Sequence, residues 1–494
     1  MKKSNYDFSE PTRQSYAAII MILFKTGYVI IRQIFPVIVI FLIGGSKYKS
    51  DYLVWFLVAI SALTMIYSII NFFKTYFIIK GDELVLHTGI FNKKKLSIPF
   101  ERIQTVNFEQ NIMHQLFSVL RMKLDTAGSE KNEFEFHAIE SEKAYALRDL
   151  IMSGKKNQKS KTVNSINAEN KVIYESILEL SPLDLLKVGL TENHIRSGGL
   201  VFLFFFWIYQ NLQEVGVNVD DYSQEIPDWQ PGLYSILTLI FILLIISILI
   251  SLVRTVIKNY DLKFLRSAKG FKVVSGLFTK KEISALDHKI QYISWSDNIL
   301  KKWIGFKDLF LNQASSNELT AKQNIHIPGC NTNHIHLVTT SLFGQIDFDN
   351  IFMHPIDKKY FSRFTLILSI IITILSGVAA IVNYQSNIIF IIGAGIYFII
   401  TRYFKFRKKA YGYNDELIYI KGGIFGDKEE VLQMFKIQAL KIHQTPYQTR
   451  HQLADITLHT ASGKIKIPYI SLSSCHYMVD LLLYKAESDT RKWM

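Results

Sequence analysis

The sequence predicts a membrane protein that combines six apolar helical spans with three copies of one α+β unit. Two observations support this class: one block of sequence occurs three times, and a pair of apolar segments precedes each copy. Composition agrees with it. Hydrophobic residues make up 49% of the 494 residues and the mean hydropathy is positive, which is typical of membrane proteins rather than of globular ones.

The repeated block begins with Gly-apolar-Phe and continues with an Ile-Gln pair at a constant spacing. Its three copies cover 89–129, 276–316 and 423–463 and align without a gap. Self-similarity of this kind indicates that one supersecondary unit was triplicated. The function is therefore to be sought in that unit.

The apolar segments predict three transmembrane hairpins. A helix needs about 20 apolar residues to cross the hydrocarbon layer, and four of the six segments come close to that length. The first is weakened by Arg32, Gln33 and Pro36, and the third is short. The expected pairs are Val29–Ile43 with Leu53–Phe73, Leu200–Leu212 with Leu233–Val253, and Phe364–Val382 with Ile388–Phe404.

Charge in the loops predicts the orientation. The tip of the second hairpin, 214–232, contains acidic residues and no Lys or Arg, whereas basic residues collect at the opposite ends of the spans, as at Arg402, Lys405 and Arg407. The positive-inside rule then places both termini and all three copies in the cytoplasm, in a multi-pass protein of the plasma membrane. Lys47 and Lys49 in the first tip argue weakly against this orientation.

The formal charge of +14 favours membrane lipids over nucleic acid as partners, because much of the basic charge flanks the spans. The predicted organisation is a surface helix and first hairpin (1–73), a first domain (74–153), a basic linker with an interfacial helix (154–195), a second hairpin (196–258), a second domain (259–345), a linker (346–363), a third hairpin (364–404) and a third domain (405–494).

Within each copy, apolar residues alternate with polar ones, as Leu84, Leu86, Leu96 and Ile98 do, and this period of two predicts half-buried strands. The glycine of each Gly-apolar-Phe block stands where a strand ends, and glycine permits the positive φ that such a turn often requires. Helical patterns follow at 142–152 and 474–486, with Ser141 and Ser473 as expected N-caps.

The chain resembles bacterial pleckstrin-homology-like membrane proteins of the second type, in their triplicated form. Three features carry the resemblance: the stretch 98–106, the segment Thr126-Ala127-Gly128, and the Ile-x-Ile-Pro endings at 325–328 and 465–468. The resemblance also covers the segment 180–196 before the second hairpin. It implies that each copy is a cytoplasmic PH-like domain, a partly open barrel of two sheets with a C-terminal helix, and it supplies no catalytic residues.

A recurring polar face is the first candidate site. Strand alternation places the basic residue before each Ile-Gln pair on one side with the glutamine, opposite the buried isoleucine. This side is either a contact surface for lipid or protein, or a place where the side chains make cross-strand hydrogen bonds or pack over the sheet edge. Its members are Arg102, Gln104, Lys289, Gln291, Lys436 and Gln438.

Lysine-rich turns are the second candidate site, for anionic lipids. The turn contains Lys93, Lys94 and Lys95 in the first copy and Lys280 and Lys281 in the second. Each lysine near an anionic leaflet could contribute about 1 kcal/mol. The third copy has an acidic turn at 426–430, which argues against a shared anion pocket.

No enzyme, metal or cofactor site is predicted. The sequence lacks the common hydrolase, nucleotide and metalloprotease motifs. His326, Cys330, His334 and His336 are dense but fit no standard zinc spacing, and Cys330 and Cys475 are expected to be free thiols in a reducing compartment.

The favoured function is protein or lipid binding and assembly at the inner membrane face, with a cognate membrane protein or self-association as the partner. The alternative is a transporter or export factor for a toxic peptide or lipid. That role requires polar residues that face each other inside the bilayer, and the second, fourth, fifth and sixth expected spans are almost free of charge.

Overall fold

A computed structural model gives two structural units, one of residues 1–173 with 278–284 and one of residues 174–277 with 285–494. The structure describes residues 6–491 except for 22, 25–26, 29–31, 33–50, 91–92, 127–133, 160–173, 193, 215–232, 315–324, 346–347, 349, 383–384 and 490. The expected first span, apart from Arg32, lies outside the described residues.

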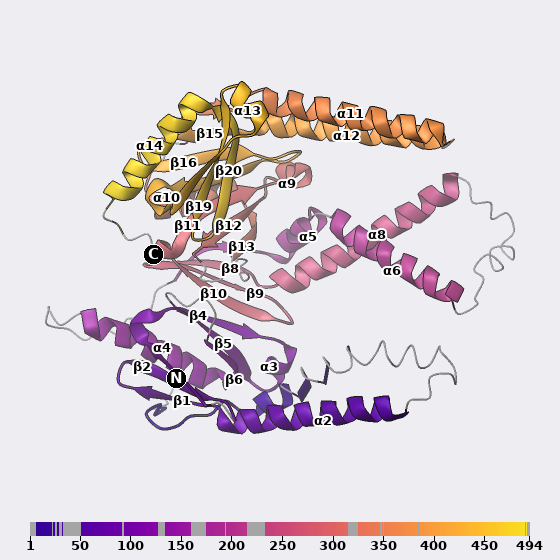
Figure 1. The fold of residues 1–494 in the computed structure, drawn as a ribbon. Coiled ribbons are helices and arrows are strands. Elements are labelled where there is room, and N and C mark those ends of the chain that lie inside the picture. Colours follow the sequence, from indigo (N-terminus) through magenta and orange to yellow (C-terminus); the bar gives the residue numbers. More distant parts are fainter. Residues whose placement is uncertain are drawn as a thin grey trace. The chain divides into compact units, whose positions relative to one another are not determined.

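The first unit contains the first repeat, which folds as two antiparallel sheets closed by a helix (Figure 1). Phe77, Leu84, Phe136 and Leu147 are fully buried between the sheets and this helix. The elements are α2 (Asp51–Lys74), β1 (Tyr76–Lys80), β2 (Glu83–Thr88), β3 (Lys94–Pro99), η2 (Phe100–Arg102), β4 (Ile103–Gln110), α3 (Ile112–Leu116), β5 (Val119–Thr126), β6 (Phe134–Glu140) and α4 (Ser141–Lys159).

The second repeat supplies a strand segment to the first unit and the rest to the second unit. The strand β10 (Lys280–Leu286) begins in one unit and ends in the other. The remaining elements of this repeat are β7 (Glu175–Glu179), α5 (Pro182–Leu190), α6 (His194–Glu214), α8 (Leu233–Asn259), β8 (Lys263–Ser267), β9 (Gly270–Ser275), η3 (Asp287–Lys289), β11 (Ile290–Ser296), α9 (Ile299–Ile304), β12 (Lys307–Gln313), β13 (Ile325–Cys330) and α10 (Thr332–Phe343).

The third repeat completes the second unit. It forms a three-stranded sheet, β18-β19-β20, and contributes four strands to a seven-stranded sheet of order β13-β12-β11-β17-β16-β15-β14. Its elements are β14 (Met353–Pro355), α11 (Lys359–Ile381), α12 (Gln385–Lys408), β15 (Ala410–Tyr413), β16 (Leu417–Gly422), β17 (Lys428–Gln433), η4 (Met434–Lys436), β18 (Ala439–His443), α13 (Pro446–Arg450), β19 (Leu453–Thr460), β20 (Gly463–Ser471) and α14 (Leu472–Ser488).

The glycine that opens each repeated block has the backbone conformation that the sequence suggested. Gly89, Gly276 and Gly423 have φ values of 99°, 111° and 119°. Residues other than glycine rarely adopt φ values in this region. The same turn is therefore built three times directly after a strand.

A short helix between two strands also recurs in all three repeats. Asn111, Asn298 and Thr445 cap α3, α9 and α13, and each side chain accepts a hydrogen bond from the main-chain N–H three residues later. Equivalent positions after these helices, Ser118, Gly305 and Gln452, are left-handed, with φ values of 52°, 76° and 53°. This shared detail confirms that one unit was copied.

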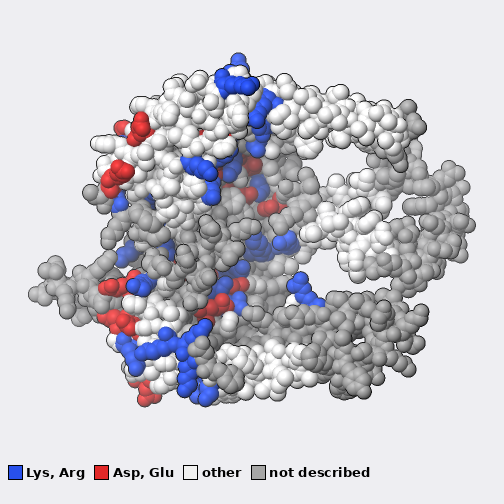
Figure 2. Space-filling model, viewed as in Figure 1, with Lys and Arg blue, Asp and Glu red and all other residues white. Residues whose placement is uncertain are grey.

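The apolar helices match the expected spans only in part. Among the described residues, three helical segments are long and apolar enough to cross a membrane: Leu237–Asn259, Lys359–Ile381 and Ile388–Lys408. The segments Ala59–Lys74 and Gly198–Ile208 are apolar but shorter. In the second unit, α11 and α12 lie side by side (Figure 1), and their surface is free of charge along the hairpin with basic side chains at its base (Figure 2).

Two details differ from the expectation. The helix α4 continues to Lys159, into the segment expected to be a linker. The N-cap of α14 is Ser471 rather than Ser473, because the Ser471 side chain accepts from the N–H of Ser474. The preceding strand β20 ends at the same residue, so the helix begins without an intervening loop.

Candidate functional site

The basic residues of the recurring polar face lie in short 3₁₀ turns rather than in strands. Arg102, Lys289 and Lys436 each end such a turn, immediately before a buried isoleucine. A 3₁₀ turn interrupts the period of two, so the alternation used to group these residues with the glutamines does not apply. Arg102 is exposed, whereas Lys289 is 2% exposed and Lys436 is 4% exposed.

Lys436 has a structural role in the second unit. Its Nζ donates hydrogen bonds to the carbonyl oxygens of Ile290 and His288. Burial lowers the pKa of Lys436 to about 8 from its ordinary value of 10.5, because removal from water disfavours the charged form. Lys436 thus hydrogen-bonds from the third repeat to the main chain of the second.

The glutamines of the recurring face are not equivalent in their surroundings. Gln291 is fully buried and Gln438 is exposed. The side chain of Gln104 lies outside the described part of the structure. The accessible members of the expected face are therefore Arg102 and Gln438, and their contact function stays a prediction.

Repeats are joined through the edges of their sheets. In the first junction, Lys280, Lys281 and Glu282 pair with Gln110, Glu109 and Phe108 of β4, all within the first unit. In the second junction, residues 428–432 of β17 pair with residues 292–296 of β11 in the second unit.

The two junctions have the same register. Lys281 and Lys428 occupy the same position in the aligned copies, and so do Glu109 and Ser296, to which they pair. The next pairs, Glu282 with Phe108 and Glu429 with Trp295, also coincide. Main-chain hydrogen bonding across a sheet edge is a general mode of protein recognition. The first and second repeats thus each accept a strand from the next repeat at the same edge.

The lysines expected to contact lipid lie at the start of β3 and in the first junction. Lys93, Lys94 and Lys95 are exposed at the start of β3. Lys280 and Lys281 are exposed and belong to the first junction, where Lys281 Nζ lies 3.8 Å from Glu109 Oε1. Contact of these residues with lipid stays a prediction.

A buried polar position in each short helix was missed by the sequence reasoning. It is occupied by His114, Lys301 and Gln448, which are 4%, 3% and 0% exposed. The signal was available in the alignment, because each residue stands three positions after the capping residue. In the second and third repeats this side chain donates to an aspartate: Lys301 Nζ lies 2.5 Å from Asp308 Oδ2, and Gln448 Nε2 lies 2.6 Å from Asp455 Oδ1.

The Lys301 cluster connects its domain to the base of the second hairpin. Lys301 Nζ also lies 3.3 Å from Glu192 Oε1, and Asn298 Nδ2 donates to the carbonyl oxygen of Thr191 at 2.7 Å. Burial raises the pKa of Asp308, but the nearby His326 and Lys301 together hold it below its ordinary value. The third hairpin has an analogous contact, since Arg363 of α11 donates to Thr445 Oγ1 at 3.0 Å. These contacts connect the second and third hairpins to their domains.

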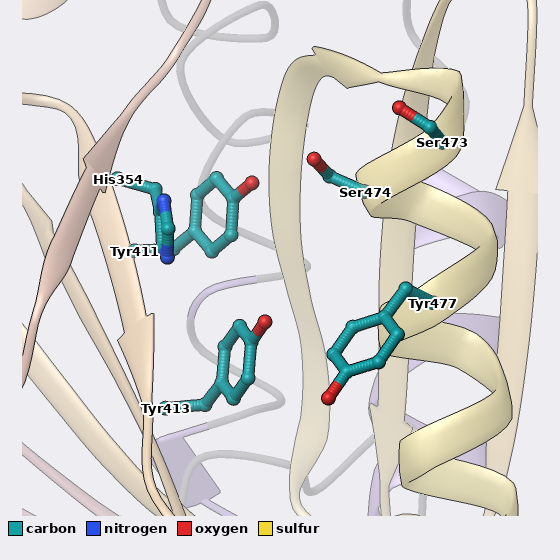
Figure 3. Close-up of a pocket in the computed structure, with 6 residues that line it drawn as sticks. All are labelled: His354, Tyr411, Tyr413, Ser473, Ser474 and Tyr477. Carbon is teal, nitrogen blue, oxygen red and sulfur yellow. The ribbon is translucent and has the colours of Figure 1, made fainter.

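The third domain has a pocket of about 260 Å³ between its first sheet and α14 (Figure 3). His354 stacks against Tyr411 and Tyr413, and Tyr477 faces them from the helix. Burial raises the pKa of both Tyr411 and Tyr413, so their hydroxyl groups stay protonated and able to donate. Ser473 and Ser474 complete a lining suited to hydrogen bonding of a small polar group.

The structure shows the surroundings of the histidines and the cysteine of the second repeat. No group of three metal-binding side chains is found among the described residues. His334 caps α10 together with Asn331, and His326 stacks on Phe310. Cys330 and Cys475 are free and buried, and burial raises the pKa of both thiols.

Comparison with known proteins identifies the repeated unit. The bacterial PH domain family matches at residues 24–155, 212–344 and 364–486, which cover more than half of the chain. The chain is also similar to the UPF0699 transmembrane protein YdbT of Bacillus subtilis (strain 168), with 24% identity over 309 residues. That match covers 60% of this chain and 62% of the relative. With three family matches and helices apolar enough to cross a membrane, the chain is a membrane protein that belongs to the bacterial PH domain family in a triplicated form.

Proposed function

We propose that this protein is a platform for binding and assembly at the cytoplasmic face of the plasma membrane, where its three PH-like domains contact proteins or lipids. The observation that carries the proposal is the sheet-edge junction, formed twice in one register. An edge that accepts a strand recognises the main chain of its partner, and side chains then set the specificity. The domains are thus built for association.

Six spans in three hairpins anchor this platform in the proposal. The described helices α8, α11 and α12 contain spans of sufficient length, and α2 and α6 supply shorter apolar segments. Contacts at the hairpin base, such as Arg363 with Thr445, support domains held close to the bilayer. A transport path would require polar side chains that face each other inside the bilayer. The proposal does not rest on such pairs, and transport is therefore not the preferred function.

Topology is tested by cysteine labelling in intact cells. Exposed positions in the three domains, Lys80, Lys269 and Lys464, are replaced singly by cysteine in a background without Cys330 and Cys475. A membrane-impermeant maleimide should leave all three unlabelled until the cells are opened, whereas Asp221→Cys in the second hairpin tip should react at once. Labelling of the domain positions from outside would refute the cytoplasmic placement.

Binding is tested by photocrosslinking in intact membranes. A photoreactive amino acid at Arg102 or Gln438, the accessible members of the recurring face, should give discrete adducts that mass spectrometry identifies as a protein or a lipid. The same amino acid at Lys269, in the turn between β8 and β9, is the matched control. Recovery of the chain without adducts from the Arg102 and Gln438 positions would contradict the binding role.

A further inference from the structure

The last sheet of the chain has an edge that is equivalent to the two junction edges but has no strand beside it among those described. β4 and β11 each accept a strand from the next repeat, whereas β18 is the terminal strand of the sheet β18-β19-β20. Equivalent side chains show the difference. Phe108 and Trp295 are 4% and 5% exposed, while Ile442 at the same position is 38% exposed.

The main chain of β18 has the same capacity to pair as that of β11. In the second junction the N–H of Asp297 donates to the carbonyl oxygen of Asp427 at 2.9 Å. Main-chain N–H and C=O groups alternate in direction along an antiparallel strand. The main-chain groups of Trp295 and Ile293 therefore point toward β17, as those of Asp297 do. Their counterparts in the aligned third copy are Ile442 and Leu440. An unpaired edge of this kind is a template for another strand.

Charge selects the type of strand. Lys441 and His443 are exposed on β18, and in the register of the second junction the residue opposite Lys441 corresponds to Glu430. The strand of the first repeat that is equivalent to β17, β3, would place the apolar Leu96 opposite Lys441 and Lys95 opposite the apolar Ile442. Opposite charges across a strand pair stabilise it, so β3 of a second copy would lack the ion pair that an acidic strand can make with Lys441.

We propose that β18 is a docking site for an extended acidic segment of another protein, which adds to the sheet as an antiparallel strand in the register of the two internal junctions. The proposal rests on the assembly role above and specifies the site and the chemistry of its partner. The segment has an acidic residue opposite Lys441 and an apolar residue opposite Leu440, as β17 presents Glu430 and Val431 to β11.

The chain itself provides the probes for the test. A synthetic peptide of residues 426–434, which contains the β17 sequence Lys-Glu-Glu-Val-Leu-Gln, is the acidic probe, and a peptide of residues 91–99, which contains β3, is the basic control. Each is titrated against the full-length protein in detergent or nanodiscs by fluorescence anisotropy. We expect saturable binding of the acidic peptide and about tenfold weaker binding of the basic one.

Two changes separate strand addition from simple charge attraction. Lys441→Glu should weaken the acidic peptide about tenfold and strengthen the basic one, whereas Lys464→Glu at an exposed position outside β18 should change neither. Methylation of the peptide nitrogen of Val431, which faces the partner strand, should abolish binding, and methylation at Glu430 should be tolerated.

Failure of the acidic peptide to bind, or binding that tolerates both methylated forms, would overturn the proposal. Exclusive binding of the full-length protein to anionic vesicles, lost in Lys441→Glu, would assign this edge to lipid and overturn it as well. Neither result would refute the assembly role, because photocrosslinking at Arg102 and Gln438 tests that role through other contacts.

Discussion

The two junctions share a register but differ in how side chains support them. The first has three cross-strand pairs, Lys280–Glu282 against Phe108–Gln110, and its ion pairs are partly exposed. The second has five pairs and adds the buried Lys436 with its hydrogen bond to the carbonyl of Ile290. The register therefore follows from the repeated backbone, and the strength of each junction follows from side chains that have diverged.

The largest effect is expected from a substitution at Gly426 that breaks the second junction. A Cβ atom at this glycine would lie 1.9 Å from the carbonyl oxygen of Asp297, which is main chain and cannot move aside. Gly426→Ala should therefore cost about 3 kcal/mol in the stability of the second unit. The loss is measured as a lower midpoint of thermal unfolding in detergent. The control is Gly422→Ala, whose Cβ meets no atom within 4 Å, and an equal loss in both variants would contradict the explanation.

A second effect is a pH dependence that belongs to the second junction. The pKa of Lys436 is about 8 in the folded protein and 10.5 ordinarily. Between these values the unfolded chain binds more protons than the folded one, so stability rises with pH through this window. The gain is on the order of 2–3 kcal/mol. Lys436→Met should remove this rise, and an unchanged pH profile would show that the lysine is not desolvated.

An intermediate effect concerns Asp427, which lies 2.7 Å from Lys302 Nζ and 2.8 Å from Lys408 Nζ. Burial raises the pKa of Asp427, but these two lysines outweigh it and hold the pKa below its ordinary value. This contribution is present above the ordinary pKa of aspartate and is lost as the pH falls through the lowered value. Asp427→Asn should cost about 1 kcal/mol at neutral pH and flatten the acid limb of the unfolding curve, with Asp415→Asn as the control.

The smallest effect is expected in the first junction. Lys281 is largely exposed and lies 3.8 Å from Glu109, so Lys281→Glu should cost about 0.5 kcal/mol. High salt should reduce this cost, because it screens exposed charges. A loss as large as that of Gly426→Ala would show that the first junction depends on charge rather than on its main chain.

The architecture of one repeat could be predicted from sequence because its signals are local. The alternation at Leu84, Leu86, Leu96 and Ile98 predicts strands, and Gly89 predicts a turn with positive φ. Both are observed. The triplication was visible for the same reason, and the family comparison confirms it. Local patterns are sufficient where one element determines its own conformation.

The junctions could not be predicted from sequence, because pairing between repeats joins segments that are far apart in the chain and leaves no periodic signal in either one. The burial of Lys289 and Lys436 was missed for a related reason. Lysine is rarely fully buried, and the carbonyl groups that accept hydrogen bonds from Lys436 belong to the neighbouring repeat. The exposure of Ile442 is not marked in the local sequence either, because it depends on which strand lies beside β18.

The junction has an evolutionary consequence. Each junction pairs β4, or its equivalent β11, with a strand of the next repeat, β10 or β17. A row of such repeats therefore has different strands at its two outer edges. Tandem gene duplication could append a further copy to the β18 end without altering any existing contact. The same junction could therefore connect further copies in series.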